Sequence, residues 1–414
     1  MRRALVLGLA RSGGAACLAL ARRHVEVIGV DRDPDADAGR LRDEGVEVVL
    51  DANDVTLLDG VDLVVKSPGI RGDSPLVAAA RDRGVPVWAE VELGFRILRN
   101  PILGVTGTNG KTTTSELLGA IFDAAERPVA VAGNVGRALC DLDGELADDA
   151  WIVCELSSFQ LEDIDEFRPR IGALLNLTPE HLDRHGSFEA YRAAKLRLFE
   201  NQTREDVAVL PRGFPSVPGR GARVEFSADD ELAAEPVLRG EHNRENAAAA
   251  SAAARAAGIA DESIAHALRT FPGVPHRLEP VRELGGVLFV NDSKATNPEA
   301  AERALSAYYP HPVRLILGGS RKDASFESLA DEARRRTVRR AYLVGEASDE
   351  LARALARAGV EHVRSGDLEA AVRDAARDAE PGDVVLLAPA CASFDQFRDF
   401  EERGRRFRAI VDAL

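Results

Sequence analysis

Short apolar runs alternate with amphipathic stretches over the first 95 residues. The runs occupy residues 4–7, 25–30, 46–50 and 61–65, and apolar positions at helical spacing lie between them. This alternation is typical of strands and helices that build a parallel sheet. We therefore predict a first α/β domain over residues 1–95.

The same alternation returns in two further series. The second begins at Pro101, has apolar runs at residues 151–156 and 171–177, and ends with an alanine-rich helix over residues 243–257. Prolines and a glycine interrupt residues 271–277. A third series follows, with strand-like runs at 287–291, 313–318, 341–345 and 383–388. The chain is thus predicted to hold two more α/β domains, over residues 96–273 and 274–414.

Composition narrows the class of protein. With 45% apolar and 29% charged residues, the 414-residue chain is typical of a globular protein. A net charge of -15 opposes general affinity for nucleic acid or anionic membrane, so a phosphate site has to be local. No run of about 18 apolar residues and no signal peptide is apparent. We expect a cytoplasmic protein without membrane insertion or a nucleic-acid partner, whose four scattered cysteines are buried thiols.

Lysine is rare in this chain, since 48 of its 53 basic residues are arginine. A chain that uses arginine for ordinary positive charge keeps lysine where a compact or reactive amine matters. We therefore treat each lysine as a candidate site residue, with chance retention as the alternative. The five are Lys66, Lys111, Lys195, Lys294 and Lys322.

A glycine-rich stretch follows the apolar run that begins at Ile102. It reads Gly-Val-Thr-Gly-Thr-Asn-Gly-Lys-Thr-Thr-Thr over residues 104–114, and a helix-forming stretch comes next. Strand, glycine loop and helix together form the phosphate-binding P-loop, in which backbone amides hold anions. Lys111 would then meet the terminal phosphates, and Thr112 would place its hydroxyl on Mg²⁺. The strict motif requires glycine where Val105 stands, so a simple glycine turn is the alternative.

The same predicted domain also contains three residues that are suited to a metal and phosphate site. Glu155 ends a predicted buried strand, and His181 and Lys195 follow it. Carboxylate and imidazole are ligands for Mg²⁺ or Mn²⁺, whereas a lysine ammonium would repel the cation unless CO₂ converted it to a carbamate. Taken alone, His181 fits a surface histidine and Lys195 the solvated face of an amphipathic helix. That helix position predicts little loss of stability when Lys195 is replaced.

Polar turns also follow strands in the first and last domains. Gly8 to Gly13, with Asp31 closing the next strand, forms a degenerate dinucleotide fingerprint or a simple packing turn. Residues 290–298, 318–326 and 388–397 place polar side chains after predicted strands. Such turns face one crevice in a parallel sheet, although each alone also fits a solvated loop.

These motifs resemble those of the Mur ligases of peptidoglycan synthesis. Segments in all three domains carry the resemblance, at residues 107–113, 133–136, 155–162, 181–185, 191–195, 241–246, 275–277, 291–297 and 390–397. The segments at 157–162, 292–296 and 393–397 resemble the D-glutamate-adding branch. The resemblance implies a Rossmann-like first domain, a P-loop ATPase-like middle domain and a Rossmann-like last domain.

The resemblance also implies roles for individual residues. Those implied for ATP are Gly107, Thr108, Asn109, Gly110, Lys111, Thr112, Thr113, Asn243, Asn246, Arg277 and Asp292. Two Mg²⁺ ions, or Mn²⁺, would be bound by Thr112, Glu155, His181 and carbamylated Lys195. The sugar-nucleotide substrate would meet Ala10, Arg11, Ser12, Asp31, Arg32, Ser67, Pro68, Gly69, Asn134 and His181. The D-glutamate pocket would be formed by Lys294, Thr296, Lys322, Ser393, Phe394 and Phe400.

The activity implied is ATP-dependent addition of D-glutamate to UDP-N-acetylmuramoyl-L-alanine through an acyl phosphate, by a monomer. Another Mur ligase, or an L-glutamate-adding variant, is the alternative. An NAD-dependent dehydrogenase would use the first glycine turn but leave the P-loop unexplained, and a nucleotide-binding scaffold would not need Lys195. Lys66 has no role in this scheme, and either Arg321 or Lys322 could meet the glutamate carboxylate.

Overall fold

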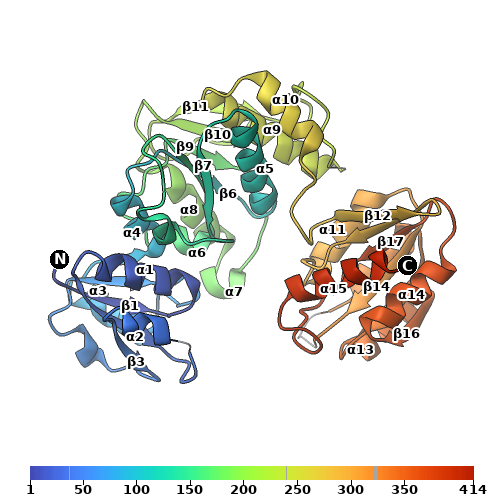
Figure 1. Cartoon of the computed structure of the whole chain (residues 1–414), viewed down its shortest axis with the longest axis horizontal. Coiled ribbons are helices and arrows are strands. Elements are labelled where there is room, and N and C mark those ends of the chain that lie inside the picture. The colour runs from blue at the N-terminus through green and yellow to red at the C-terminus, as the bar shows by residue number, and fades with distance from the viewer. Residues whose placement is uncertain (37, 239, 321–324) are drawn as a thin grey trace. The chain divides into compact units, whose positions relative to one another are not determined.

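The computed structural model describes residues 1–36, 38–238, 240–320 and 325–414. Three β-sheets follow one another along this part of the chain, and helices cover them (Figure 1). The predicted α/β fold with mainly parallel sheets is confirmed. Lys322 and Arg321 lie outside the described residues.

The first sheet is five-stranded and parallel. Its elements are β1 (Arg3–Leu7), α1 (Arg11–Ala21), β2 (Glu26–Asp31), α2 (Gly39–Asp43), β3 (Glu47–Leu50), η1 (Val55–Leu58), β4 (Leu63–Lys66), α3 (Pro75–Asp82), β5 (Val87–Ala89) and α4 (Glu90–Ile97). The strand order is β3-β2-β1-β4-β5. Successive residues of β1 face opposite sides, so Val6 packs with α1 while Leu5 packs with α3. Burial on both faces explains why the strands read as continuous apolar runs.

The middle sheet has six parallel strands. Its elements are β6 (Ile102–Thr106), α5 (Lys111–Ala124), β7 (Val129–Gly133), η2 (Leu139–Leu142), β8 (Trp151–Glu155), α6 (Ser158–Leu161), β9 (Ile171–Leu174), α7 (Leu182–His185), α8 (Phe188–Leu196), η3 (Arg197–Phe199), β10 (Val207–Pro211), β11 (Ala222–Phe226), α9 (Glu241–Ala256) and α10 (Asp261–Thr270). The order is β11-β10-β9-β6-β8-β7. Because β6 lies inside the sheet, the loop that follows it has a strand end on either side.

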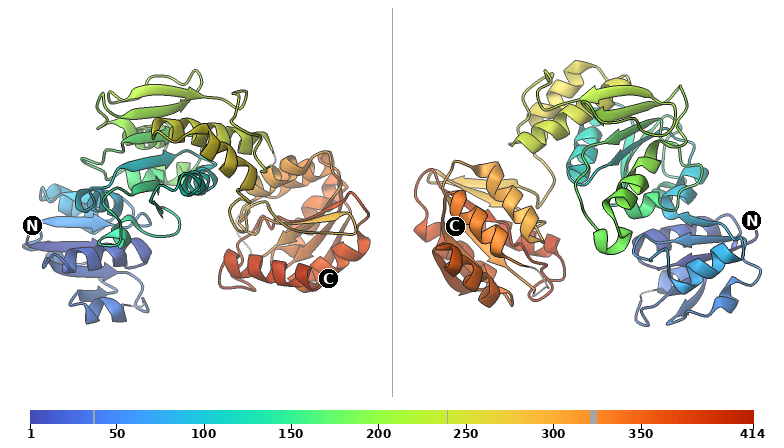
Figure 2. Two further views of the ribbon diagram at one scale, coloured as in Figure 1. Left: turned by 45° about the horizontal axis from the view of Figure 1, so that its top comes forward. Right: turned by 180° about the vertical axis from the view of Figure 1, so that it is seen from behind.

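The last sheet has six strands, of which only the first is antiparallel to its neighbour. Its elements are β12 (Glu279–Leu284), β13 (Val287–Asn291), α11 (Pro298–Tyr308), β14 (Val313–Gly318), α12 (Glu327–Arg335), β15 (Val338–Val344), α13 (Ser348–Ala358), β16 (His362–Gly366), α14 (Leu368–Asp378), β17 (Val384–Leu387) and α15 (Phe400–Asp412). The order is β12-β13-β17-β14-β15-β16. Leu315 packs with α11, α12 and α13, whereas Ile316 packs with α14 and α15 on the other face, and Figure 2 shows the helices around this sheet.

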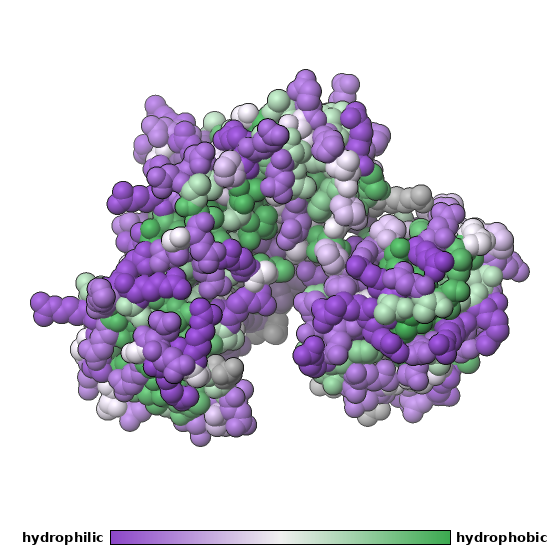
Figure 3. All heavy atoms as spheres, in the orientation of Figure 1, coloured by the Kyte–Doolittle hydropathy of each residue, from purple (hydrophilic) through white to green (hydrophobic). Residues whose placement is uncertain are grey.

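The described residues form two compact units. Unit 1 comprises residues 1–236 and 245–270 and holds the first two sheets, and unit 2 comprises residues 237–244 and 271–414 and holds the last sheet. On the face drawn in Figure 3, hydrophilic side chains cover most of each unit and apolar residues gather in smaller areas. Within the described ranges, no helix is both long and apolar enough to cross a membrane. The domain boundaries near residues 95 and 273 stay predictions.

A buried ion pair joins the first sheet to the middle one inside unit 1. Lys66, at the end of β4, places its Nζ 2.9 Å from Oδ2 of Asp163, and both side chains are almost fully buried. The same Nζ donates to the carbonyl of Ile70, and Arg81 binds the other oxygen of Asp163 at 2.6 Å. Lys66 therefore has a role in connecting the two sheets, which its sequence context does not indicate.

We expect Lys66→Met to destabilise unit 1 by about 3 kcal/mol, because removing one partner leaves a buried charge poorly compensated. The chain has two tryptophans, Trp88 and Trp151, and both lie in unit 1. Denaturant unfolding followed by tryptophan fluorescence therefore reports on unit 1 alone.

Arg83→Met is the matched control for Lys66→Met. It breaks the exposed ion pair between Arg83 and Asp59 in the same unit and should change stability by less than about 0.5 kcal/mol. Equal effects of the two substitutions would contradict the role assigned to Lys66.

Candidate active site

The glycine-rich loop between β6 and α5 has the backbone of an anion-binding loop. Gly107 and Gly110 have φ values of 154° and 84°, and Gly110 caps the N-terminus of α5. A Cβ atom on Gly110 would lie 2.1 Å from Oδ1 of Asn246, so this position has no room for a side chain. The loop therefore places the N-terminus of α5 at one edge of the sheet, although Val105 departs from the strict motif.

Two residues that the sequence analysis missed hold this loop in place. The side chain of Asn176 accepts from the Asn109 amide at 2.8 Å and donates to the Asn109 carbonyl at 3.2 Å. The hydroxyls of Tyr191 and Thr108 lie 2.9 Å apart. The sequence did contain a signal for each residue. Asn176 follows the end of the apolar run that forms β9, and Tyr191 belongs to the motif at residues 191–195.

Lys111 and Lys195 meet at one carbonyl group of the loop. Lys111 Nζ donates to the carbonyls of Gly107 and Thr108, at 2.9 and 2.8 Å. Lys195 Nζ donates to the same Gly107 carbonyl at 2.8 Å. The structure thus brings the two lysines together, as their place in one domain suggests.

The expectation that Lys195 sits on a solvated helix face is wrong. Its exposed fraction is 2%, because α8 packs this side of the helix against the P-loop. Burial, and to a lesser degree the nearby Lys111 ammonium, lower the pKa of Lys195 to about 7. Replacing Lys195 is therefore not a surface substitution.

Glu155 lies at the end of β8, beside β6 in the sheet, and carries an unsatisfied oxygen. Its Oε1 accepts from the side-chain amide of Asn134 at 3.0 Å. Its buried Oε2 has no hydrogen-bond partner among the described residues. A buried carboxylate oxygen of this kind fits a metal ligand, since unpaired charge is costly to bury.

His181 is exposed and precedes α7 in a left-handed conformation, with φ of 54°. Its ring packs against Phe159 at 4.9 Å between centroids. Across the described residues, no group of three or more His, Cys, Asp and Glu side chains gathers to hold a metal. The predicted metal ligands include only two such side chains, Glu155 and His181, so this finding does not test the predicted metal site.

The first sheet also carries a tight glycine turn at its carboxyl edge. Asp31 accepts from the Leu9 amide at 2.6 Å, and Ser67 donates to the Gly8 carbonyl at 2.8 Å. A Cβ on Gly13 would lie 1.7 Å from the Gly8 oxygen. These contacts bring the predicted residues around positions 8–13, 31 and 67 to one edge of the sheet.

In unit 2, the turns after β13 and β17 hold several of the remaining predicted residues. Asp292 is buried, accepts from the Leu278 amide at 3.1 Å, and has its pKa raised by burial to about 6. Lys294 Nζ lies 5.8 Å from the centroid of the Phe400 ring. Ser393 is buried, while the Phe394 side chain is exposed. Asn243 belongs to this unit and Asn246 to unit 1, although both are on α9.

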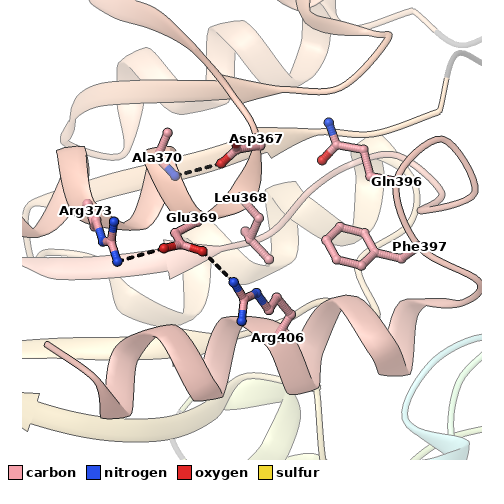
Figure 4. A pocket seen from close by; sticks show the side chains of 8 residues that line it. All are labelled: Asp367, Leu368, Glu369, Ala370, Arg373, Gln396, Phe397 and Arg406. Atoms are coloured by element: carbon pink, nitrogen blue, oxygen red, sulfur yellow. Dashed lines mark hydrogen bonds and ion pairs between the residues drawn. The ribbon is translucent and has the colours of Figure 1, made fainter.

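A pocket elsewhere in unit 2 contains none of the predicted site residues. Figure 4 shows Glu369 of α14 held between Arg373 and Arg406, with Phe397 and Gln396 beside them. Asp367 also lines the pocket, so two carboxylates balance two arginines and the pocket presents no net positive charge to an anionic ligand.

Comparison with known proteins identifies the family. Three family models match, namely the MurD-like N-terminal domain at residues 2–89, the Mur ligase middle domain at 105–219 and the glutamate ligase domain at 276–391. A protein of Geobacillus kaustophilus named UDP-N-acetylmuramoylalanine–D-glutamate ligase is 43% identical over 443 residues, covering 100% of this chain and 98% of its own. The chain belongs to the Mur ligase family. A protein of the same name from Acidobacterium capsulatum is 42% identical, covering 99% of this Mur ligase and 96% of its own chain.

Solved structures share the fold of this Mur ligase. A UDP-N-acetylmuramate-alanine ligase from Thermotoga maritima has a TM-score of 0.62 at 18% identity, with full coverage of both chains. A MurF ligase from the same organism, solved with ADP, has a TM-score of 0.60 at 18% identity and covers 94% of this chain and 95% of its own. These likenesses confirm the three-domain α/β fold that the motifs implied.

The lowered pKa of Lys195 predicts a pH-dependent stability. Between about pH 7 and 10.5 the unfolded chain holds a proton that the folded chain lacks, so stability rises with pH in this window. In CO₂-free buffer, tryptophan-detected unfolding should show the wild type gaining stability relative to Lys195→Met from pH 7 to 9. A constant difference between the two proteins would contradict the lowered pKa.

Proposed function

We propose that this Mur ligase joins D-glutamate to UDP-N-acetylmuramoyl-L-alanine in an ATP-dependent amide-forming reaction of peptidoglycan precursor synthesis. The proposal rests on the similarity, over the whole chain, to two ligases that are named for these two substrates. The P-loop with its paired lysines supplies the phosphate chemistry that such a reaction needs. The enzyme is proposed to act as a cytoplasmic monomer.

ATP is assigned to the loop after β6. Within the loop from Gly107 to Thr113, the amides from Gly110 onward would bind phosphate oxygens, since those of Thr108 and Asn109 donate to Asn176. Lys111 would neutralise the phosphate charge. The buried Asn246 beside Gly110 supports this assignment. The other ATP contacts proposed are Asn243, Arg277 and Asp292.

Mg²⁺ is assigned to Thr112, Glu155, His181 and Lys195 in its carbamylated form. The unsatisfied Oε2 of Glu155 supports a cation here, and the burial of Lys195 favours the neutral amine that reacts with CO₂. When bound, two Mg²⁺ ions, or Mn²⁺, would offset negative charge on the phosphates.

The two remaining substrates are assigned to the first and last sheets. The sugar nucleotide is proposed to bind the glycine turn of the first sheet, at Ala10, Arg11, Ser12, Asp31, Arg32, Ser67, Pro68 and Gly69, with Asn134 and His181 from the middle domain. D-glutamate is proposed to bind the polar turns of unit 2, at Lys294, Thr296, Lys322, Ser393, Phe394 and Phe400.

The reaction proposed has two steps. The alanine carboxylate of the sugar nucleotide attacks the γ-phosphate of ATP, and ADP leaves with formation of an acyl phosphate. The amine of D-glutamate then attacks the activated carbonyl and releases phosphate, so no protein nucleophile is needed. Lys111 acts by neutralising the phosphate charge that would repel the incoming carboxylate.

Phosphate release with a panel of amino acids tests the function. We expect release that requires both UDP-N-acetylmuramoyl-L-alanine and D-glutamate, with L-glutamate and other D-amino acids giving at most a few per cent of that rate, about a hundred-fold discrimination. Preference for L-glutamate or for another amino acid would favour the alternative Mur ligase activity. Phosphate release independent of any amino acid would contradict the proposal.

Lys195→Arg tests the carbamate. Arginine keeps the positive charge but forms no stable carbamate, so we expect kcat to fall at least about a hundred-fold. In the wild type, ¹³C-labelled bicarbonate should give a carbamate carbon signal that is absent from the variant. Arg192→Lys, on the same helix, is the control and should keep its activity. Normal turnover by Lys195→Arg would overturn the assignment.

A further inference from the structure

Arg403, on the first turn of α15, is a buried arginine in unit 2 that the proposed mechanism does not use. Its exposed fraction is 2%, and it is among the largest fully buried side chains of the described chain. Burial lowers the pKa of its guanidinium to about 10, and the nearby Asp395 carboxylate opposes this shift to a smaller degree. The group is therefore still charged at neutral pH, at a considerable desolvation cost.

Five hydrogen bonds use the donors of this guanidinium. Nε donates to the Ser293 hydroxyl at 3.0 Å, and Nη2 donates to the carbonyls of Ser293 and Cys391 at 2.9 and 3.1 Å. Nη1 donates to the carbonyls of Ala392 and Gly318 at 3.2 and 3.5 Å. Gly318 is the last residue of β14, and the other acceptors lie in the turns that follow β13 and β17.

These three strands are neighbours in the sheet, in the order β13-β17-β14. Their carboxyl ends meet at one edge, where Arg403 makes its hydrogen bonds. The packing is tight, because a Cβ on Gly319 would lie 2.1 Å from the Ala392 oxygen and 3.1 Å from Nη1 of Arg403. The Ser293 hydroxyl, held by Nε, also donates to the Phe400 carbonyl at 2.8 Å.

The acceptors after β13 and β17 adjoin residues assigned to the amino-acid pocket. Lys294 follows Ser293, Ser393 follows Ala392, and Phe400 is bound through Ser293. A lysine at position 403 would offer three donors from one point instead of five from a planar fork, and could not reach three strand ends at once. The arginine therefore connects the carboxyl ends of the three strands.

We propose that Arg403 is the positioning residue of the amino-acid pocket, joining the carboxyl ends of β13, β14 and β17 through backbone carbonyls and adding a buried positive charge beside them. This inference rests on the proposed function, since the ligand it serves is the dicarboxylate amino acid. It assigns to Arg403 no contact with the reacting atoms.

Steady-state kinetics of Arg403→Lys provide the first test. We expect KM for D-glutamate to rise at least about ten-fold, while KM for ATP and for the sugar nucleotide changes less than about two-fold. Arg314→Lys is the matched control, because Arg314 pairs with Asp383 at the opposite end of the same sheet, where β14 begins. It should lower the stability of unit 2 without a selective change in KM for D-glutamate.

Chemical rescue provides the second test. In Arg403→Ala, guanidinium ion below denaturing concentrations should restore part of the lost affinity for D-glutamate, and the same ion should not improve Arg314→Ala. An unchanged KM for D-glutamate in Arg403→Lys, or equal losses for all three substrates, would overturn the proposal.

The wild-type panel separates this inference from the proposed function. If the wild type uses another acidic amino acid, the proposed substrate is wrong. KM for that amino acid is then compared between Arg403→Lys and the wild type. A wild type that uses no amino acid overturns both proposals.

Discussion

The direction of the strands determines where chemistry is placed in this protein. In a parallel sheet all carboxyl ends lie at one edge, so turns that are distant in sequence become neighbours there. The loop after β6 lies between the ends of β8 and β9, which place Glu155 and Asn176 beside it. The same rule brings the turns after β13, β14 and β17 together around Arg403. The parallel strand direction therefore gathers polar side chains from separate loops at the carboxyl edge of each of the three sheets.

Much of this arrangement could be predicted from the chain because apolar runs and glycine turns are local signals. The runs at 287–291 and 313–318 coincide with β13 and β14, and the P-loop glycines adopt the positive φ values that the motif requires. β12 was not predicted, since Pro280 interrupts a polar segment. Such a strand is tolerated because it pairs on only one side, at the edge of the sheet, with an irregular register beside the proline.

Buried charges were harder to predict, because their partners are far away in the sequence. Lys66 and Arg403 resemble ordinary surface cations until Asp163 and the three turns are seen around them. The burial of Lys195 was equally hard to predict, because helical periodicity cannot indicate that the P-loop packs over the polar side of α8. The scarcity of lysine did indicate which cations deserved attention, but it could not separate Lys66, which connects two sheets, from Lys111 and Lys195 beside the P-loop.

The carbonyl shared by Lys111 and Lys195 has a practical consequence for handling the protein. Two amines at one acceptor repel each other when both are protonated, and an anion that enters beside them relieves this repulsion. Ligands that bind only the folded chain raise its melting temperature in proportion to the logarithm of their concentration, once they are in excess. Simple phosphate, sulfate or pyrophosphate in a storage buffer should therefore act as a stabilising additive, and a comparison of buffers by thermal shift should be read with this in mind.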